Sequence, residues 1–192
     1  MDSSNSILVY WVVDCTAGGM KMRGEAAYLH SAEKIVPTPH PQLAVQVRDK
    51  VAGGGALYEA ARRWVAAGYR VYVNDRADVA LAAGAEGVQL PGGGLLPRQV
   101  RALGDLKVGV SIHAPSEVTR EADFCVLAPI FASPGKGEPL GIRALAEAAA
   151  RGVPIIALGG IDPSNARECL QAGAAGVAAI RAGAALARAL LS

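Results

Sequence analysis

Short runs of apolar residues alternate along the chain with longer stretches that are rich in alanine and leucine. Each run is nearly continuous in hydrophobicity and rich in β-branched residues, which is typical of parallel strands that are covered on both faces. The runs predicted as strands are Ile7–Val13, Leu43–Val47, Tyr69–Val73, Gly87–Leu90, Lys107–Val110, Phe124–Leu127, Pro154–Leu158 and Gly176–Ile180.

The stretches between the runs carry the apolar spacing of amphipathic helices. The clearest are Gly55–Ala67, Leu140–Arg151 and Pro163–Ala172. Asp162 and Pro163 form a helix-start signal, with the aspartate as N-cap and the proline at the first helical position. Several stretches are closed by a glycine suited to a left-handed conformation, namely Gly68, Gly84, Gly104, Gly152 and Gly173.

Eight strand–helix repeats predict a compact (β/α)8 TIM barrel, and a chain of 192 residues is near the small limit for that fold. We expect residues 1–192 to form a single domain. A doubly wound open sheet is the alternative, but no G-x-G-x-x-G follows the first run and no G-x-x-x-x-G-K-[ST] occurs. The stretch Cys15–Gln42 is the least regular and is interpreted as a short helix followed by a mobile loop.

Composition narrows the class of protein further. Hydrophobic residues make up 52% of the chain and charged residues 19%, which excludes an intrinsically disordered protein. A net charge of +2 is too small to indicate nucleic acid or an anionic membrane as a partner. The chain has no apolar run long enough to span a membrane, no signal-peptide pattern and only three widely spaced cysteines. We therefore expect a soluble cytoplasmic protein.

Polar side chains gather after the predicted strands, where barrel enzymes place their chemistry. Gln46, Arg48 and Lys50 alternate, so on an extended strand end their side chains point the same way. Two cations and an amide suit a phosphate or diphosphate, although a solvated strand end gives the same pattern. Asn74 and Asp75 suit a metal or a polar substrate, and Asp75 suits equally the cap of the next helix.

Five further candidate residues follow later strands. Gly159 and Gly160, with Arg181 after the last strand, occupy the loops where many barrels bind phosphate at helix N-termini; a tight left-handed turn is the alternative for the glycines. Lys136 stands in a glycine-flanked loop and reads either as a charge on a mobile lid or as a solvated lysine. His113 reads either as a proton carrier or as a structural histidine.

Together these segments resemble the thiamine phosphate synthase/TenI family of small (β/α)8 barrels. The resemblance is carried, in the family's order, by VQVRDK (45–50), VYVNDRADVALAAGAEGVQLPG (71–92), VGVSIHAPSE (108–117), LAPIFASPGKGEPLGI (127–142) and VPIIALGGIDPSNARECLQAGAAGVA (153–178). The family's synthase joins hydroxymethylpyrimidine diphosphate to a thiazole phosphate and releases diphosphate with Mg²⁺.

The resemblance implies a role for each matching residue. Gln46, Arg48 and Lys50 match the residues that hold the pyrimidine diphosphate. Asn74 matches an asparagine that contacts this substrate, and Asp75 matches an aspartate that holds Mg²⁺. The other matches are Ser111 and Lys136, at diphosphate or pyrimidine contacts, and Gly160, at the thiazole phosphate.

The chain also departs from the synthase pattern. Pro91-Gly92-Gly93-Gly94 stands where the synthase has a second Mg²⁺ aspartate, and Gln89 replaces the preceding histidine. The threonines around the lid lysine are reduced to Ser133 and Gly135, and Arg181 stands at a serine position. Loss of a carboxylate weakens Mg²⁺ binding, since few protein oxygens hold this cation.

The departures and the VQLPG stretch favour the TenI branch, whose known activity is the aromatising tautomerisation of a thiazole carboxylate phosphate. That reaction needs no metal, but it needs a proton carrier and a phosphate anchor. The histidine that serves one TenI enzyme is Pro129 here, so His113 becomes the candidate proton carrier, and His113 and Lys136 are the expected catalytic residues.

Three functions are therefore weighed. A TenI-like thiazole tautomerase, without cofactor, is the first. A thiamine phosphate synthase that uses Mg²⁺ is the alternative, and a non-catalytic binder of thiazole or thiamin phosphate is the third. The expected partners are a phosphorylated thiazole and, for the synthase, a pyrimidine diphosphate, with homo-oligomerisation left open and neither nucleic acid nor membrane involved.

Overall fold

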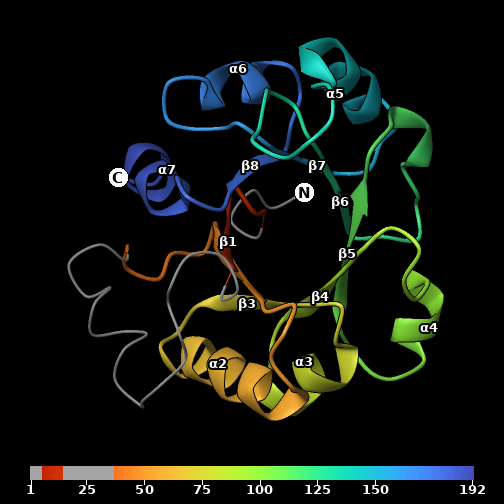
Figure 1. The fold of residues 1–192 in the computed structure, drawn as a ribbon, viewed down its shortest axis with the longest axis vertical. Coiled ribbons are helices and arrows are strands. Elements are labelled where there is room, and N and C mark those ends of the chain that lie inside the picture. The colour runs from red at the N-terminus through yellow and green to blue at the C-terminus, as the bar shows by residue number, and fades with distance from the viewer. Residues whose placement is uncertain (1–5, 15–36) are drawn as a thin grey trace.

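The computed structural model describes residues 6–14 and 37–192, and in it eight parallel strands close into a barrel in chain order (Figure 1). The strands are β1 (Val9–Asp14), β2 (Leu43–Arg48), β3 (Arg70–Asn74), β4 (Gly87–Leu90), β5 (Lys107–Ile112), β6 (Phe124–Leu127), β7 (Ile155–Leu158) and β8 (Gly176–Ala179). Pairing of β8 with β1 completes the barrel. The predicted (β/α)8 architecture is confirmed, and the open doubly wound sheet is excluded.

Helices cover the outside of the barrel, with α2 and α3 packed together beyond β3 and β4, and α5 and α6 on the opposite side (Figure 1). They are α2 (Gly54–Ala66), α3 (Ala77–Ala83), α4 (Pro97–Arg101), α5 (Gly141–Ala149), α6 (Ala166–Gln171) and α7 (Gly183–Leu190). Only a 3₁₀ turn, η2 (Pro115–Glu117), lies between β5 and β6. Within the described ranges, no helix is long and apolar enough to cross a membrane.

Two local expectations were wrong. The helix predicted to start at Pro163 begins at Ala166. The Asp162 carboxylate accepts hydrogen bonds from the backbone N–H and the hydroxyl of Ser164, as the predicted N-cap would, but residues 163–165 form a turn before the helix. Gly104 does not take the left-handed conformation that Gly68, Gly84, Gly152 and Gly173 adopt. Most of the irregular stretch Cys15–Gln42, residues 15–36, lies outside the described residues.

Three aromatic rings fill the middle of the barrel. Tyr10, Tyr72 and Phe124 come from β1, β3 and β6, which are not neighbours, so their contacts run across the lumen. Their centroids lie 5.4–5.6 Å apart in edge-to-face arrangements. Such geometry adds about 1 kcal/mol per pair to the free energy of burial. Alternate strand positions therefore face the lumen, while the others pack against helices.

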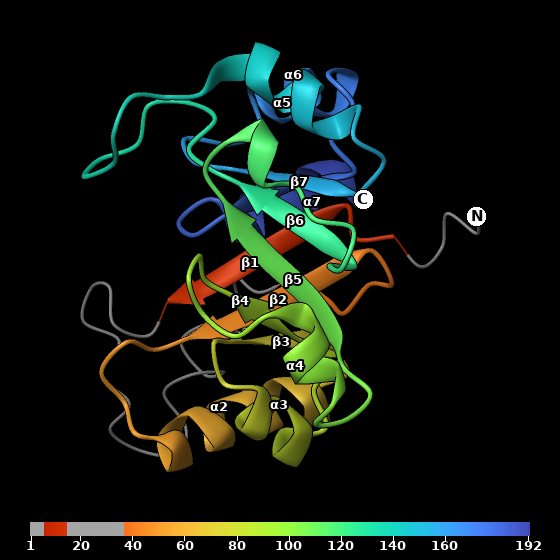
Figure 2. The same ribbon diagram turned by 90° about the vertical axis from the view of Figure 1, so that its right-hand side faces the viewer.

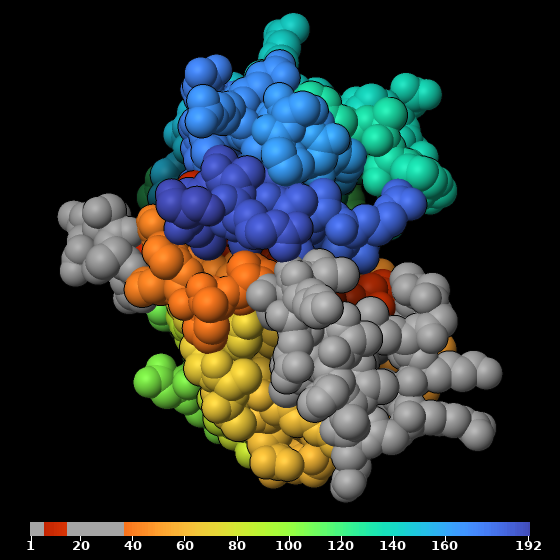
Figure 3. Space-filling model, turned by 90° about the vertical axis from the view of Figure 1, so that its left-hand side faces the viewer, coloured from red at the N-terminus to blue at the C-terminus, as the bar shows by residue number. Residues whose placement is uncertain are grey.

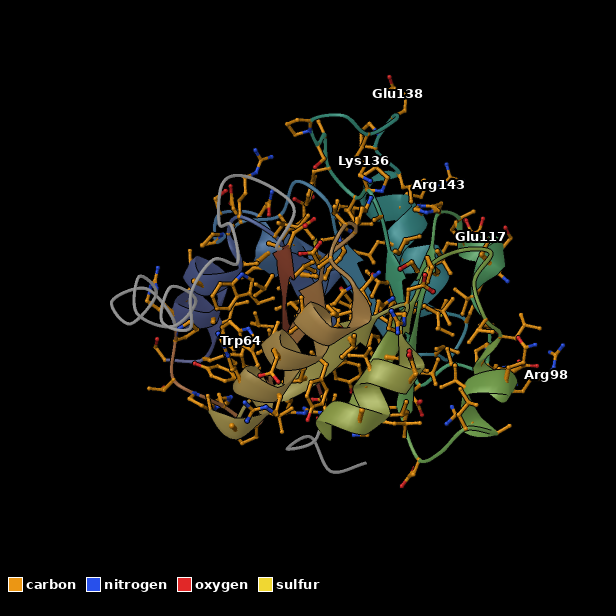
Figure 4. The ribbon with its side chains drawn as sticks, turned by 60° about the horizontal axis from the view of Figure 1, so that its bottom comes forward. Trp64, Arg98, Glu117, Lys136, Glu138 and Arg143 are labelled. Atoms are coloured by element: carbon orange, nitrogen blue, oxygen red, sulfur yellow. The ribbon has the colours of Figure 1, made fainter. Side chains whose placement is uncertain are left out.

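The space between strands and helices is filled mainly by aliphatic side chains. Trp64 of α2, labelled in Figure 4, is the exception in size. Its ring contacts those of Trp11 and Tyr69, with centroids 5.7 and 4.8 Å away. On the neighbouring face, α7 lies between the segment around α6 and the segment that leads into β2 (Figure 3). Helix α7, the last of the chain, also packs against β1 and β8.

A half-buried charge cluster lies at the amino-terminal mouth of the barrel. Glu86 accepts hydrogen bonds from Arg70 at 2.6 and 2.7 Å, from Lys107 at 2.8 Å and from the Tyr72 hydroxyl at 3.1 Å. Burial by itself raises the pKa of Glu86, but the hydrogen bonds from Arg70 and Lys107 outweigh it and lower this pKa to about 2. The carboxylate is therefore charged across the range in which unfolded glutamates titrate.

This cluster predicts a pH-dependent part of the stability. A depressed pKa contributes stability above the unfolded value near 4.5, and that contribution is lost as the pH falls towards 2. Because the site is partly solvated, we expect Glu86→Gln to lower the free energy of unfolding by about 1–2 kcal/mol at pH 7. Urea denaturation at pH 7, 4 and 2.5 measures the difference between the two proteins.

The matched control is Glu59→Gln, because Glu59 pairs with Arg62 on the exposed surface of α2. We expect that variant to stay within about 0.5 kcal/mol of the parent protein. A difference in the free energy of unfolding between Glu86→Gln and the parent protein that does not shrink from pH 7 to pH 2.5 would contradict the assignment.

Candidate functional site

The carboxyl ends of the strands form one mouth of the barrel. In Figure 2 the arrowheads of β1, β5 and β6 point to the same side, and the loop between β6 and α5 extends past it. The strand-end residues predicted to carry the chemistry therefore belong to this mouth, and several of them pair across neighbouring strands.

Arg48, at the end of β2, forms an ion pair with Asp14, at the end of β1. Its Nε and Nη2 lie 3.0 and 2.6 Å from Oδ2 of Asp14, and the two residues are register partners. The Asp14 side chain is only 4% exposed, whereas that of Arg48 is 26% exposed. The pair fixes the guanidinium at the mouth and compensates part of its charge.

Gln46 and Asn74 form a second pair, between β2 and β3. Gln46 Nε2 donates to Asn74 Oδ1 at 2.9 Å, and Gln46 is almost fully buried. Lys50, the third member of the alternating set, is not on the strand. Asp49 accepts hydrogen bonds from the N–H groups of Val51 and Ala52, so the chain turns after Arg48 and leaves Lys50 exposed. The alternation predicted a shared direction for three residues, and the strand extends only to the second.

Asp75 is an exposed residue in a left-handed conformation, with φ of 60°. Its backbone N–H donates to the Gln89 carbonyl at 2.9 Å, which ties this turn to β4. Left-handed backbone costs a residue other than glycine about 1 kcal/mol, less for aspartate and asparagine. The N-cap residue of α3 is Arg76, and no side chain caps this helix. The reading of Asp75 as a helix cap is therefore wrong, and its carboxylate is free for another role.

The donor set for Mg²⁺ is small. Among the described residues, no three His, Cys, Asp or Glu side chains form a group that could hold a metal. Asp75 is an exposed carboxylate at this mouth, whereas the Asp14 carboxylate is bound to Arg48. Mg²⁺ commonly takes one or two protein carboxylates and fills its other positions with substrate phosphate and water. Asp75 therefore fits Mg²⁺ that arrives with a phosphorylated substrate.

A third pair joins Gln89 of β4 and Ser111 of β5; the sequence predicted Ser111 as a substrate contact, but it predicted no role for Gln89 in the site. Gln89 Nε2 donates to Ser111 Oγ at 3.0 Å, and Gln89 Oε1 accepts from the Tyr10 hydroxyl at 3.3 Å. Gln89 is 1% exposed. The available signal was one amide inside the apolar run Gly87–Leu90, but a bond to Tyr10 across the lumen cannot be read from strand order.

His113 follows β5 and is exposed, with its ring Nδ1 at 2.8 Å from the Ala128 carbonyl oxygen. A carbonyl only accepts, so Nδ1 carries the proton and Nε2 is the basic nitrogen of the neutral ring. The His113 backbone N–H donates to the Glu117 carboxylate at 2.8 Å. The imidazole is thus oriented by its surroundings, as both a proton carrier and a structural histidine require.

Lys136 and Glu138 lie on the loop that projects between β6 and α5 (Figure 4). The Lys136 backbone N–H donates to the Ser133 carbonyl at 3.1 Å, and Gly135 takes a left-handed conformation in the same turn. The lysine side chain is exposed. The structure therefore places Lys136 on the loop beside the mouth rather than within the paired strand ends.

The glycine pair after β7 is required by packing. Both glycines have positive φ, and a Cβ would lie 2.7 Å from the Pro129 Cα at Gly159 and 2.6 Å from the Ala132 carbonyl oxygen at Gly160. Helix α6 begins at Ala166, so the expected helix N-terminus beside this pair is wrong, because the turn at Asp162 intervenes. Arg181 is exposed and directly precedes Ala182, the N-cap residue of α7.

Comparison with known proteins adds independent information. The family model described as thiamine monophosphate synthase matches residues 21–182. A thiamine-phosphate synthase from Methanoregula boonei is 37% identical over 188 residues, covering 91% of this chain and 84% of its own. One from Anaeromyxobacter dehalogenans is 44% identical over 152 residues, covering 72% and 68%.

Among solved structures, the thiamine phosphate pyrophosphorylase from Pyrococcus furiosus superimposes with a TM-score of 0.75, covering 97% of this chain and 96% of its own. Its sequence identity of 24% supports the fold alone. The names of these relatives agree with the synthase, which was the alternative prediction, and do not support the tautomerase, which was the favoured one. On the family model and these relatives, the chain belongs to the thiamine monophosphate synthase family.

Proposed function

We propose that this protein is a thiamine-phosphate synthase that joins hydroxymethylpyrimidine diphosphate to a thiazole phosphate and releases diphosphate. The observation that carries the proposal is the row of paired polar side chains at the carboxyl ends of β1, β2 and β3. A relative named as a thiamine-phosphate synthase aligns with 91% of this chain. That end of a barrel is where enzymes of this fold carry out their reactions.

Arg48 binds the diphosphate in this proposal, because Asp14 holds the guanidinium in place before the substrate arrives. Lys50 and Lys136, both exposed beside the mouth, add positive charge from two loops. Fixed cations stabilise negative charge that grows on the leaving group without reorganising during the reaction. Asn74, oriented by Gln46, offers its amide N–H groups to the same substrate.

The thiazole phosphate binds at Gly160 and Arg181 in this proposal. Arg181 precedes the N-terminus of α7, where the helix dipole and free N–H groups already favour an anion. A cation alone is unfavourable beside a helix N-terminus, and a phosphate held between the two removes that conflict.

The reaction breaks the C–O bond between the pyrimidine methylene and the diphosphate, which departs with the bonding electrons. The thiazole nitrogen then uses its lone pair to form the new C–N bond. Mg²⁺, when bound by Asp75 and the substrate phosphates, supplies charge stabilisation to the leaving diphosphate. Arg48, Lys50 and Lys136 hold that diphosphate. Gly160 and Arg181, in the loops after β7 and β8, hold the thiazole phosphate within reach of it.

We expect the protein to release diphosphate when both substrates and Mg²⁺ are present, and to stop when EDTA is added. Arg48→Ala should lower kcat about 100-fold, because it removes charge from the leaving group. Arg181→Ala should mainly raise KM for the thiazole phosphate. A coupled assay for inorganic diphosphate measures both variants.

Arg151→Ala is the control, since Arg151, in the turn after α5, pairs with Glu147 on the exposed surface of that helix. Because Arg48→Ala removes the ion-pair partner of the nearly buried Asp14 carboxylate, the variant Asp14→Asn/Arg48→Gln repeats the test with both charges of the pair removed. Equal loss of kcat in the Arg48 and Arg181 variants would contradict the assigned roles.

Asp75→Asn tests the metal assignment. Asparagine tolerates the left-handed backbone at this position, so the fold is preserved while the charge is lost. We expect the Mg²⁺ concentration for half-maximal rate to rise about tenfold, which a titration at saturating substrate measures. Asp105→Asn, at an exposed carboxylate that precedes β5, should leave it unchanged. An unchanged requirement in Asp75→Asn would refute the assignment.

A thiazole tautomerase is the second candidate, favoured by the orientation of His113, which leaves Nε2 as the basic nitrogen. It predicts conversion of the thiazole carboxylate phosphate tautomer with uptake of deuterium from D₂O, without metal. His113→Ala should abolish this exchange, whereas His40→Ala should not. Proton NMR measures the deuterium exchange. A wild-type protein that shows no exchange would exclude the tautomerase. Binding of the thiazole phosphate without any turnover would indicate the non-catalytic binder.

A further inference from the structure

A hydrogen-bonded chain of three side chains crosses the barrel beneath the candidate site. It runs from the Tyr10 hydroxyl of β1 to Gln89 Oε1 of β4 at 3.3 Å, and from Gln89 Nε2 to Ser111 Oγ of β5 at 3.0 Å. Tyr10 and Gln89 are buried, with exposed fractions of 0% and 1%, whereas Ser111 is half-buried at the carboxyl end of its strand. Only the last member is within reach of a ligand.

The direction of donation along these hydrogen bonds is set by Tyr10, at their buried end. Burial, with Tyr72 and Glu86 nearby, raises the pKa of Tyr10 well above its ordinary value, so its hydroxyl keeps its proton. A buried O–H needs an acceptor, and Gln89 Oε1 is the acceptor beside it. The amide is thereby oriented with its N–H groups toward Ser111, and the Ser111 oxygen accepts one of them.

The barrel also makes room for this arrangement. Gly109 is the register partner of Gln89, and a Cβ at that position would lie 2.3 Å from Gln89 Oε1 and 2.5 Å from Phe124 Cζ. The glutamine side chain therefore occupies space that a glycine leaves open. Gly109 leaves room for the amide of Gln89, and the hydrogen bond from Tyr10 orients that amide.

A serine whose oxygen already accepts a hydrogen bond directs its own proton elsewhere. The Ser111 hydroxyl lies at the mouth, where the proposed function places the pyrimidine diphosphate. We propose that Gln89 is a positioning residue: with Tyr10 behind it, it orients Ser111 so that the Ser111 hydroxyl donates its proton to an acceptor atom of the bound pyrimidine diphosphate. This inference rests on the proposed function for the identity of that ligand.

The test is a double-mutant cycle between positions 89 and 111. Gln89→Met keeps the length of the side chain and removes its polar atoms, and Ser111→Ala removes the hydroxyl. We expect each single variant to lower kcat/KM for the pyrimidine diphosphate about tenfold, the loss of one good hydrogen bond. In the Ser111→Ala background, Gln89→Met should cost less than twofold more, because Gln89 acts only through Ser111.

Gln89→His supplies a conservative variant, since an imidazole N–H can also donate to Ser111 Oγ. We expect it to keep kcat/KM within about threefold of the parent protein, since the Ser111 oxygen again accepts an N–H. Tyr10→Phe, which frees the amide to turn, should give an intermediate loss that also disappears in the Ser111→Ala background. Both variants keep the inference testable if Gln89→Met fails to fold, which thermal denaturation checks.

A merely structural role gives a different result. It predicts that Gln89→Met lowers kcat/KM by the same factor with serine or alanine at position 111, and that result would overturn the inference while leaving the synthase assignment intact.

Calorimetric titration with hydroxymethylpyrimidine diphosphate separates the two proposals when turnover is absent. If the wild-type protein releases no diphosphate but binds this ligand, the same non-additive, about tenfold loss of affinity supports the inference and refutes the synthase. If the wild-type protein neither turns over nor binds it, both proposals are overturned.

Discussion

The volume of the lumen is the constraint on which the rest of this barrel depends. Tyr10, Tyr72 and Phe124 meet within it, and the strands next to those of Tyr72 and Phe124 carry glycine where the rings need room. A Cβ at Gly87 would lie 2.6 Å from the Tyr72 ring, and a Cβ at Gly109 would lie 2.5 Å from that of Phe124. Close packing of this kind leaves little space for polar side chains inside the lumen, so most polar side chains of the strands lie towards the two mouths.

The two mouths use their charges differently. At the amino-terminal mouth, one carboxylate binds two cations and a phenol, and the cluster satisfies itself. At the carboxyl mouth, each pair orients one group and leaves hydrogen-bonding capacity toward solvent: Asp14 holds Arg48, Gln46 holds Asn74, and Gln89 holds Ser111. Stability is concentrated at one end, and prearranged polar groups at the other, as in barrel enzymes generally.

The sequence was sufficient for the architecture because parallel strands covered on both faces leave a clear pattern of apolar runs. Gly87–Leu90 and Phe124–Leu127 agree with the structure at both ends. The segments that follow strands were harder to predict. The Asp49 carboxylate stabilises a turn that begins before Lys50, and a turn over residues 163–165 precedes α6. The expected direction of Gln46 and Arg48 followed from period-two spacing. Their partners did not, because the spacing along the chain does not give the register that sets Asp14 beside Arg48 and brings Asn74 to Gln46.

The fit between Gly109 and Gln89 also limits how this family member can change over evolutionary time. A side chain larger than glycine at position 109 would meet the Gln89 amide at 2.3 Å and the Phe124 ring at 2.5 Å, so these side chains would have to move or become smaller. A shorter residue at position 89 removes the hydrogen bond to Ser111. Substitutions at position 109 are therefore coupled both to the packing of the lumen and to the candidate site.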